Sequence, residues 1–292
     1  MSSSNTLRLV FPQWQGGNNA PYYFGAQLLN WLAPAPQGVV EHVDVEQPTE
    51  QPLKNENGLM GRQALLNQLK DARAKIDKHA PDSIVILGGD CLVDLAPFAY
   101  LNEKYDGELA VLWVDAHPDI LTPEQFEHAH AQVLGNLLGH GDSDFTAHVK
   151  QPLKPENVCY LGVNDATEWE QQRMQTLGLK NISPTQLAEE GSEPLLAWFK
   201  ATGAKHLAIH LDLDVLDPNL FRGLLFANTD YAEGALDGIA QGKLSIRQVV
   251  DALADVSKVS QVVGLGITEH LPWDALALKQ MMEQLPLIGV TH

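Results

Sequence analysis

The chain has few cysteines, few basic side chains and no long apolar run, and each shortage excludes a class of protein. Its only cysteines are Cys91 and Cys159, too few for the disulfide framework of small secreted domains. No segment approaches the roughly 18 apolar residues of a membrane-spanning helix. The start, MSSSNTLRLVF, lacks the basic and apolar regions of a signal peptide. We therefore expect a cytoplasmic protein without a membrane partner.

Basic side chains are outnumbered, 19 against 37 acidic ones, which gives a formal net charge of −18. The sequence has no basic stripe, and its charge would repel a phosphate backbone, so nucleic acid is excluded as a partner. An acidic surface attracts cationic small molecules, although the same charge also serves solubility alone. Charge by itself leaves both interpretations open.

No Ser/Gly linker, charge block, low-complexity run or internal repeat divides the 292 residues, so we expect one domain spanning residues 1–292. Short apolar or β-branched runs of strand length alternate with longer segments of helical spacing. The predicted strands are 7–11, 39–45, 83–87, 109–114, 158–163, 206–211 and 261–267, and predicted helices include 59–79, 183–199 and 245–256. This alternation predicts an α/β fold with a mostly parallel sheet covered on both faces.

Two clusters of metal-competent side chains stand at the ends of predicted strands. Asp115, His117 and Asp119 follow the run 109–114, and Asp212 and Asp214 follow the run 206–211. Alternate residues of an extended segment share one face, and ligands bind at the carboxyl ends of parallel strands, so each cluster can converge on one site. Crowded carboxylates in a partly dehydrated cleft repel one another unless a cation neutralises them. The sequence therefore predicts one or two divalent metal ions.

Four motifs between residues 83 and 272 resemble, in the same order, those of the arginase-like ureohydrolases, which include arginase, agmatinase and formimidoylglutamase. The motifs are GGDC at 88–91, similar to the family's Gly-Gly-Asp-His; WVDAHPD at 113–119, similar to Asp-Ala-His-x-Asp; HLDLDVLDP at 210–218, similar to Ser-x-Asp-x-Asp-x-x-Asp-Pro; and GITE at 266–269, similar to a late acidic motif. The resemblance implies a three-layer α/β/α sandwich of the arginase type.

The resemblance also implies a chemistry. The family's metal ligands fall on Cys91, Asp115, His117, Asp119, Asp212 and Asp214. Two divalent ions, most often manganese, would share bridging carboxylates and hold a hydroxide that attacks the central carbon of a guanidine-type group. Glu269 is expected to bind the guanidinium or amidine group, and Asp214 to handle the proton of the departing nitrogen. The implied enzyme is a ureohydrolase, a hydrolase of linear amidines.

Cys91 stands where most members of the family have a histidine that ligates one metal. A thiol beside a dication usually ionises and binds as thiolate; otherwise Cys91 is a small buried thiol and one metal position is weak or empty. Sulfur moves the preference from manganese toward iron, cobalt or zinc, although the oxygen-rich remainder still suits manganese. A thiolate ligand also occurs in arginase-like hydrolases that act on N-hydroxyarginine.

The loop after the second motif departs from the family as well. Leu138 replaces the family's proton-shuttling histidine. Asn136 is the only residue of the family's arginine-recognition loop that this sequence clearly retains. His128, His130 or His140 can take over the proton role because imidazole titrates near neutrality, although each is equally well an ordinary exposed histidine. Plain L-arginine is therefore not the expected substrate.

Three further features stay open at this point. Residues 221–243 replace a short turn of the family with a stretch of unusual length, which predicts either a lid or a disordered segment. Arg222 within it either meets a substrate carboxylate or is solvated. His210 either lies beside the metals or is an ordinary strand histidine whose ring nitrogens are hydrogen-bonded within the protein.

The expected partner is a small cationic substrate: a guanidine, a hydroxyguanidine such as N-hydroxyarginine, or a formimidoyl compound, which would release urea, hydroxyurea or a related amide. The loss of two family histidines, at Cys91 and Leu138, leaves an alternative. In it, the chain is a catalytically weak or inactive member of the family with a binding or regulatory role. Close relatives often form trimers or hexamers, so the resemblance also leaves room for a homo-oligomer.

Overall fold

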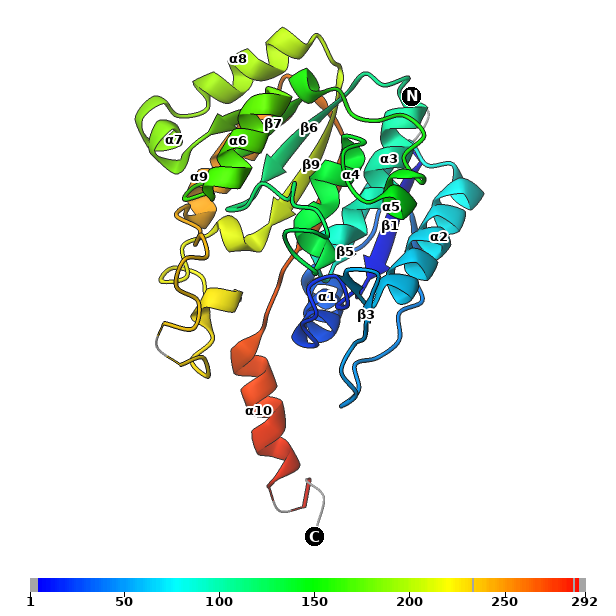
Figure 1. Cartoon of the computed structure of the whole chain (residues 1–292), viewed down its shortest axis with the longest axis vertical. Coiled ribbons are helices and arrows are strands. Elements are labelled where there is room, and N and C mark those ends of the chain that lie inside the picture. The colour runs from blue at the N-terminus through cyan, green and yellow to red at the C-terminus, as the bar shows by residue number, and fades with distance from the viewer. Residues whose placement is uncertain (1–4, 233, 286, 289–292) are drawn as a thin grey trace.

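The computed structural model describes residues 5–232, 234–285 and 287–288, with strands at the centre and helices around them (Figure 1). Eight strands of this described part form one sheet in the order β2-β1-β5-β10-β9-β6-β7-β8, and every neighbouring pair is parallel. The strands are β1 Thr6–Phe11, β2 Val39–His42, β5 Ser83–Gly88, β6 Leu109–Val114, β7 Val158–Leu161, β8 Lys180–Ile182, β9 His206–Asp212 and β10 Gln261–Thr268. The predicted parallel sheet is confirmed.

The α-helices fall between the strands, as the alternating pattern predicts. They are α1 Pro21–Leu32, α2 Arg62–His79, α3 Leu95–Lys104, α4 Val133–Leu137, α5 Ser143–Thr146, α6 Glu168–Leu177, α7 Pro184–Glu190, α8 Glu193–Thr202, α9 Ile246–Ser257 and α10 Trp273–Glu283. Ser245 caps α9 by accepting a hydrogen bond from the backbone N–H of Gln248, and the Gln248 side chain accepts one in return from the backbone of Ser245. This capping box explains why the sequence predicts the start of this helix so closely.

Two predicted helices differ from the observed ones. The expected helix 59–79 begins only at Arg62, because Leu59–Met60 (β4) pairs with Asn55–Glu56 (β3) in a short antiparallel ribbon. The expected helix 183–199 is two helices, since Gly191 adopts a φ of +62° after α7 and a proline lies in the first turn of α8. Proline in the interior of one continuous helix would remove a backbone hydrogen bond, and here it starts a new helix instead.

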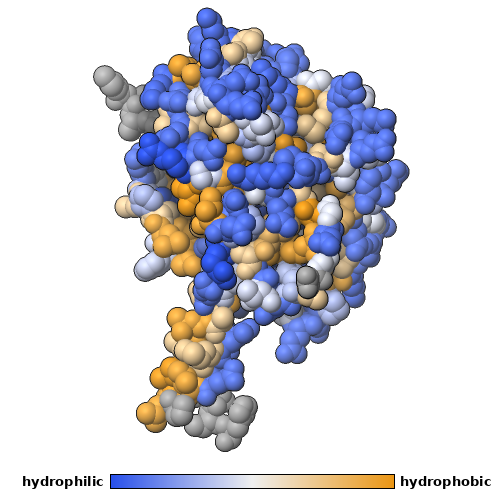
Figure 2. Space-filling model, turned by 90° about the vertical axis from the view of Figure 1, so that its left-hand side faces the viewer, coloured by the Kyte–Doolittle hydropathy of each residue, from blue (hydrophilic) through white to orange (hydrophobic). Residues whose placement is uncertain are grey.

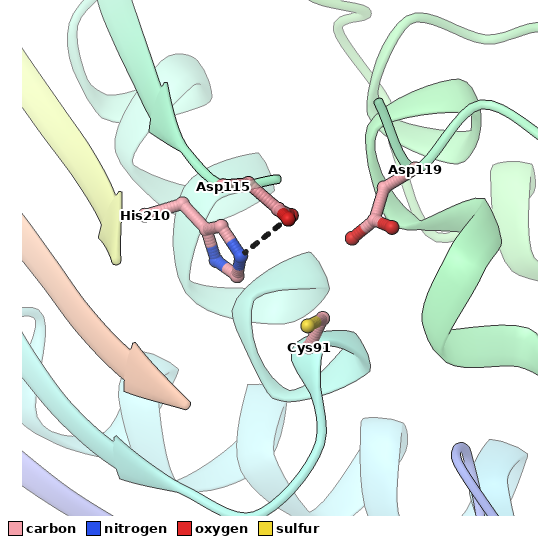
Figure 3. A group of neighbouring side chains, drawn as sticks. All are labelled: Cys91, Asp115, Asp119 and His210. Carbon is pink, nitrogen blue, oxygen red and sulfur yellow. Dashed lines mark ion pairs between the residues drawn. The ribbon is translucent and has the colours of Figure 1, made fainter. Parts of the chain in front are cut away.

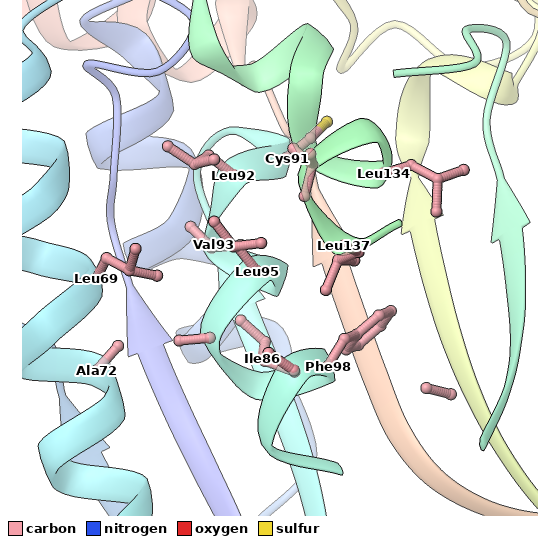
Figure 4. Close-up of a cluster of buried hydrophobic side chains, with 14 of the residues drawn as sticks. Leu69, Ala72, Ile86, Cys91, Leu92, Val93, Leu95, Phe98, Leu134 and Leu137 are labelled. Atoms are coloured by element: carbon pink, nitrogen blue, oxygen red, sulfur yellow. The ribbon is translucent and has the colours of Figure 1, made fainter. Parts of the chain in front are cut away.

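Both faces of the sheet bury apolar side chains, because successive residues of a strand point to opposite faces. Val111 and Trp113 of β6 join the core beneath α2, α3 and α4, whereas Leu112 and Val114 join the core beneath α7, α8 and α9. Figure 4 shows part of the first core, in which Leu69 of α2 lies among side chains of β5 and α3. Helices on both faces confirm the three-layer α/β/α architecture.

Helix α10 extends away from the body of the molecule (Figure 1), and none of its residues is buried. Its apolar side chains Leu278, Met281 and Met282 are exposed, and Figure 2 shows apolar residues along this projection. No helix among the described residues has both the length and the apolar character needed to cross a bilayer.

Candidate metal centre

Four neighbouring strands, β5, β10, β9 and β6, deliver polar side chains to one edge of the sheet. Cys91 follows β5, Asp115 follows β6, Asp212 ends β9 and Glu269 follows β10. Because all four strands are parallel, their carboxyl ends meet at this edge. Cys91, Asp212 and Glu269 line one cavity of about 470 Å³, together with the loops that follow the strands. Asp115 is fully buried behind this lining.

The turn after β5 is built to present Cys91. Gly89 lies against the backbone of Gln13, where a Cβ atom would come within 1.7 Å of the carbonyl oxygen, so no larger residue fits. Asp90 is buried and accepts hydrogen bonds from the backbone N–H groups of Leu92 (3.1 Å) and Gly17 (3.3 Å). Its carboxylate therefore ties the 3₁₀ turn that carries Cys91 to the loop after β1.

One group of ligand atoms forms around the Asp115 carboxylate. His117 Nδ1 lies 3.5 Å from Asp115 Oδ1 and 3.0 Å from Asp214 Oδ2. The other oxygen, Asp115 Oδ2, accepts a hydrogen bond from Trp113 Nε1 at 3.0 Å. The three side chains Asp115, His117 and Asp214 form a group whose ligand atoms all lie within 4.8 Å of one another.

A second group forms around the Cys91 thiol, which is buried. Cys91 Sγ donates to Asp212 Oδ2 at 2.9 Å and lies 3.6 Å from Glu269 Oε1. Ligand atoms of Cys91, His130 and Glu269 lie within 4.8 Å of one another. Those of Cys91, Asp115, Asp119 and His210 do so as well, and Figure 3 shows these four side chains pointing into a common space. Asp115 thus belongs to both of the metal-competent groups that contain aspartates.

Electrostatics show how costly these carboxylates are without a cation. Burial raises the pKa of Asp119 and Asp212 well above the ordinary range, and neighbouring carboxylates raise both further. Burial also raises the pKa of Asp214, which His117 partly offsets. Burial acts in the same direction on Asp115, but His117 and His210 outweigh it and hold its pKa below the ordinary value. Protons thus occupy positions that a metal ion can take.

The residues fit divalent metal ions. Asp119 Oδ2 and His117 Nε2 are buried and have no hydrogen-bond partner among the described residues. Buried polar atoms without partners are rare in proteins and call for an explanation. Carboxylate oxygens, imidazole nitrogen and thiolate sulfur are all metal donors, and their clustering at one edge supplies that explanation.

The raised carboxyl pKa values predict that the stabilisation by metal increases with pH. In the metal-free protein these carboxyls bind protons more tightly when folded than when unfolded, so stability is lost as pH rises from about 4 through the raised pKa values. Metal ions replace those protons, and the loaded protein escapes this loss. We expect the difference in Tm between manganese-loaded and chelator-treated protein to be several degrees larger at pH 8 than at pH 5, measured by scanning calorimetry. An equal difference at both pH values would contradict this assignment.

The structure separates the three candidate histidines of the long loop. His130 and His128 line the cavity, whereas His140 is exposed and lies outside the lining residues. His130 Nδ1 lies 3.2 Å from Glu269 Oε1, and burial together with nearby His128 lowers the pKa of His130 to about 3. His130 is therefore a neutral imidazole in contact with the predicted substrate-binding carboxylate. Of the three, it is the one that the geometry favours for the proton role.

The stretch 221–243 borders the cavity through Leu225, Phe226 and Tyr231, and its described residues follow one path that includes a short 3₁₀ turn. The choice between a lid and a disordered segment stays a prediction. Arg222 is exposed, lies 4.0 Å from Asp274 and does not line this cavity, so it has no contact with the site.

Sequence reasoning missed two parts of the site. Asp94, in the turn after Cys91, is fully buried and accepts or shares a hydrogen bond with His210 Nδ1 at 2.8 Å. Residues 164–167, after β7, also line the cavity. Asp94 lies three residues after Cys91 in the same 3₁₀ turn, and a single buried acidic residue produces no periodic pattern in the sequence, so only the fold reveals its role.

Comparisons with known proteins identify a matching family model, related sequences and similar folds. The model of the arginase family matches residues 35–274. An arginase of Staphylococcus aureus strain MRSA252 is 26% identical over 191 residues, a match that covers 61% of this chain and 60% of that protein. The chain thus matches less than two thirds of the length of that curated relative.

Solved structures show the same fold. The arginase of Entamoeba histolytica in complex with L-ornithine superposes with a TM-score of 0.77 at 18% identity, covering 93% of this chain and 92% of the other. The formimidoylglutamase of Bacillus subtilis gives a TM-score of 0.67 at 15% identity, covering 93% and 81%.

Proposed function

Because the chain belongs to the arginase family, we propose that it is a metal-dependent hydrolase of a carbon–nitrogen bond in a small cationic guanidine, hydroxyguanidine or formimidoyl compound. One observation carries the proposal: Asp119, Asp212, Asp214 and His117 line the same cavity as the buried Glu269, with the buried Asp115 beside them, and Asp119 and His117 have donor atoms without a hydrogen-bond partner among the described residues. We take residues 1–292 as one catalytic domain, because the site draws on loops from near residue 17 to residue 269.

Asp115, His117, Asp119, Asp212, Asp214 and Cys91 would hold two divalent ions. When bound, the ions supply an acidified water as nucleophile and stabilise developing negative charge. Manganese suits the oxygen-rich side of the site, whereas Cys91 favours iron, cobalt or zinc. The buried carboxylates stay ionised beside the ions, so they keep the site close to neutral.

Glu269 would bind the cationic end of the substrate. Its carboxyl is buried, and burial raises its pKa well above the ordinary value, which favours the protonated form before a cation binds. A guanidinium offers parallel N–H donors that match a carboxylate, and its positive charge would favour ionised Glu269, whose proton would leave to solvent as the substrate enters. His130, hydrogen-bonded to Glu269, orients this carboxyl.

Asp214 would supply the proton that the departing nitrogen requires, and the neutral imidazole of His130 would relay a proton between its two ring nitrogens. Asp214 lies at the cavity beside His117, with its Oδ2 3.0 Å from the His117 ring nitrogen. General acids must lie within hydrogen-bond reach of the proton they transfer, and both side chains line the cavity in which the substrate would sit. His128 lines it too, and His140 does not.

The remaining lining restricts the substrate. Among the described residues of the lining there is no lysine or arginine. A substrate carboxylate would therefore meet neutral donors, such as the side chains of Asn18, Asn19, Asn164 and Thr167. Phe126 and Phe226 give the cavity an apolar wall, which suits a substrate with a short aliphatic chain.

A substrate panel tests the proposal. Arginine, N-hydroxyarginine, agmatine, guanidinobutyrate, guanidinopropionate and formimidoylglutamate are incubated with protein loaded with manganese, iron, cobalt or zinc, and amide and amine products are measured. We expect one compound to exceed arginine in kcat/KM by at least about tenfold, since the arginine loop is lost. No turnover with any metal, in protein that retains fewer than half an ion per chain, would favour the inactive, ligand-binding alternative.

A further inference from the structure

We propose that His210 is a metal ligand, held in place by Asp94, and that it shares one ion with Cys91, Asp115 and Asp119. The inference rests on the proposed metal-dependent function, because it concerns how this chain holds one of the two ions. It goes beyond that function by adding a nitrogen donor at a position where the family motif has a serine.

His210 is placed as a ligand would be. It lies in β9, is fully buried, and stacks on Trp113 of the neighbouring strand with ring centroids 3.8 Å apart at 16°. This stacking fixes the plane of the imidazole. Its Nε2 atom lies 3.7 Å from Asp115 Oδ2 and has no hydrogen-bond partner among the described residues.

The opposite nitrogen is already in use. His210 Nδ1 lies 2.8 Å from Asp94 Oδ2, and both side chains are fully buried. If Nδ1 donates its proton to Asp94, the lone pair of the imidazole is left on Nε2, toward the carboxylates. A carboxylate that accepts the second ring N–H is the usual arrangement behind a metal-bound histidine, because it fixes the tautomer and raises the basicity of the ligand.

Space for Asp94 is provided by a glycine. A Cβ atom at Gly266 of β10 would lie 2.0 Å from Asp94 Oδ2, so any side chain there would displace the carboxylate. The late motif that begins with Gly266 therefore serves the pairing of Asp94 with His210 as well as the placement of Glu269. The pairing of Asp94 with His210 therefore depends on the absence of a side chain at Gly266.

The distances fit a shared ion. Ligand atoms of Cys91, Asp115, Asp119 and His210 lie within 4.8 Å of one another, all from buried residues (Figure 3). Two atoms bound to one ion at 2.0–2.3 Å lie at most ~4.0–4.6 Å apart, so small shifts close the shell. Asp119 Oδ2, the other unpartnered atom of this group, completes it.

This set of donor atoms changes which metal ion the position prefers. Cys91 and His210 are the two departures from the family's motifs in this part of the site, and their ligand atoms are neighbours. A sulfur and a nitrogen added to two carboxylates give a mixed donor set that prefers zinc, iron or cobalt over manganese. The group of Asp115, His117 and Asp214 is richer in oxygen and keeps the preference for manganese.

The test is a substitution of His210 by glutamine, with metal binding as the readout. In His210→Gln, we expect the affinity for the ion at Cys91 to fall, as measured by competitive titration with a chromophoric chelator. The fall should exceed the ~10–100-fold loss that follows removal of a residue hydrogen-bonded to a metal ligand. Asp94→Asn should weaken it by ~10–100-fold. Pulsed electron paramagnetic resonance of protein that holds two manganese ions per chain, labelled with ¹⁵N-histidine, should show two histidine nitrogens in the wild type and one in His210→Gln.

His206 provides a matched control. It lies in the same strand, is half-buried and stacks on Tyr105 at 3.7 Å, but it is remote from the carboxylates. His206→Gln should leave both metal affinities and both nitrogen signals unchanged. If His210→Gln does not fold, the wild-type spectrum still decides, because a single histidine nitrogen at the two ions would overturn the proposal. Unchanged affinity in folded His210→Gln would overturn it as well.

The outcomes separate this inference from the proposed function. Loss of one ion in His210→Gln, from a wild-type protein that hydrolyses no compound of the panel, would support His210 as a ligand and refute the catalytic proposal. Full metal content in an active His210→Gln variant would refute the ligand role and leave the hydrolase intact. A His210 ring with both nitrogens protonated in the loaded protein, seen by ¹⁵N resonance, would also refute it.

Discussion

Replacing Asp115 by alanine is expected to remove both metal ions and to lower hydrolysis by at least about 10³-fold. Asp115 is the one aspartate whose oxygens belong to both metal-competent groups, the group with His117 and Asp214 and the group with Cys91 and Asp119. A carboxylate shared in this way bridges two ions, and its loss leaves the remaining carboxylates to repel one another. Elemental analysis after dialysis measures the metal content, and product release measures the rate.

Asp251→Ala is the matched control for this substitution. Asp251 is exposed on α9 and, among the described residues, forms an ion pair with Arg247 alone, so its removal should change neither metal content nor rate. Exposed pairs of this kind contribute little to stability. Two ions per chain in folded Asp115→Ala would contradict the bridging role. Asp212→Ala is also expected to lose metal ions and activity, because Asp212 lies among the candidate ligands, with Oδ2 2.9 Å from the Cys91 thiol.

Replacing Glu269 by glutamine is expected to lower kcat/KM by about 10²–10³-fold while both ions stay bound. The substitution keeps the size of the side chain and removes its negative charge. Loss of one partner of a buried, hydrogen-bonded charge pair costs ~2–5 kcal/mol, which corresponds to this range. The steady-state rates of both proteins on the best substrate of the panel measure the effect.

Two controls complete the Glu269 experiment. Metal content should be unchanged in Glu269→Gln, which separates substrate binding from metal binding. Glu283→Gln, in exposed helix α10 where Glu283 pairs with Lys279, should leave the rate unaltered. A Glu269→Gln variant with normal kcat/KM would show that the cation is recognised elsewhere in the cavity.

The strands and the order of layers follow closely from the sequence pattern. The run 109–114 is continuously apolar and is observed as β6 with the same bounds, buried on both faces. Strand β8, Lys180–Ile182, escapes prediction because it has three residues, is exposed in part and lies at the edge of the sheet. An edge strand pairs with one neighbouring strand only and is less buried than a central strand. Its sequence therefore has a weaker apolar pattern.

The candidate ligands follow from the sequence for a simple reason. Asp115, His117 and Asp119 are close in the chain, so they reach one site although the segment bends rather than staying extended, with Asp119 at a φ of +50°. Cys91 and Glu269 lie 178 residues apart, yet Sγ and Oε1 are 3.6 Å from each other. Resemblance to family motifs predicts their shared site, but periodicity alone does not, because it records only local neighbours.

The choice among equivalent side chains required the fold. His128, His130 and His140 have the same chemistry and nearly the same place in the chain, and only the path of the loop brings His130 to Glu269. Asp94 looks like one more acidic residue in a turn, until β9 places His210 at 2.8 Å from it.

By itself, the sequence determined the layered parallel sheet, the edge at which its strands end, and the requirement for a cation among crowded carboxylates. These follow from side-chain periodicity and from charge, which are properties of neighbouring residues. Tertiary structure alone decided which imidazole meets Glu269, and that His210 turns an unpartnered nitrogen toward Asp115. Such pairings join distant segments, and their energy depends on burial that exists only after the strands have come together.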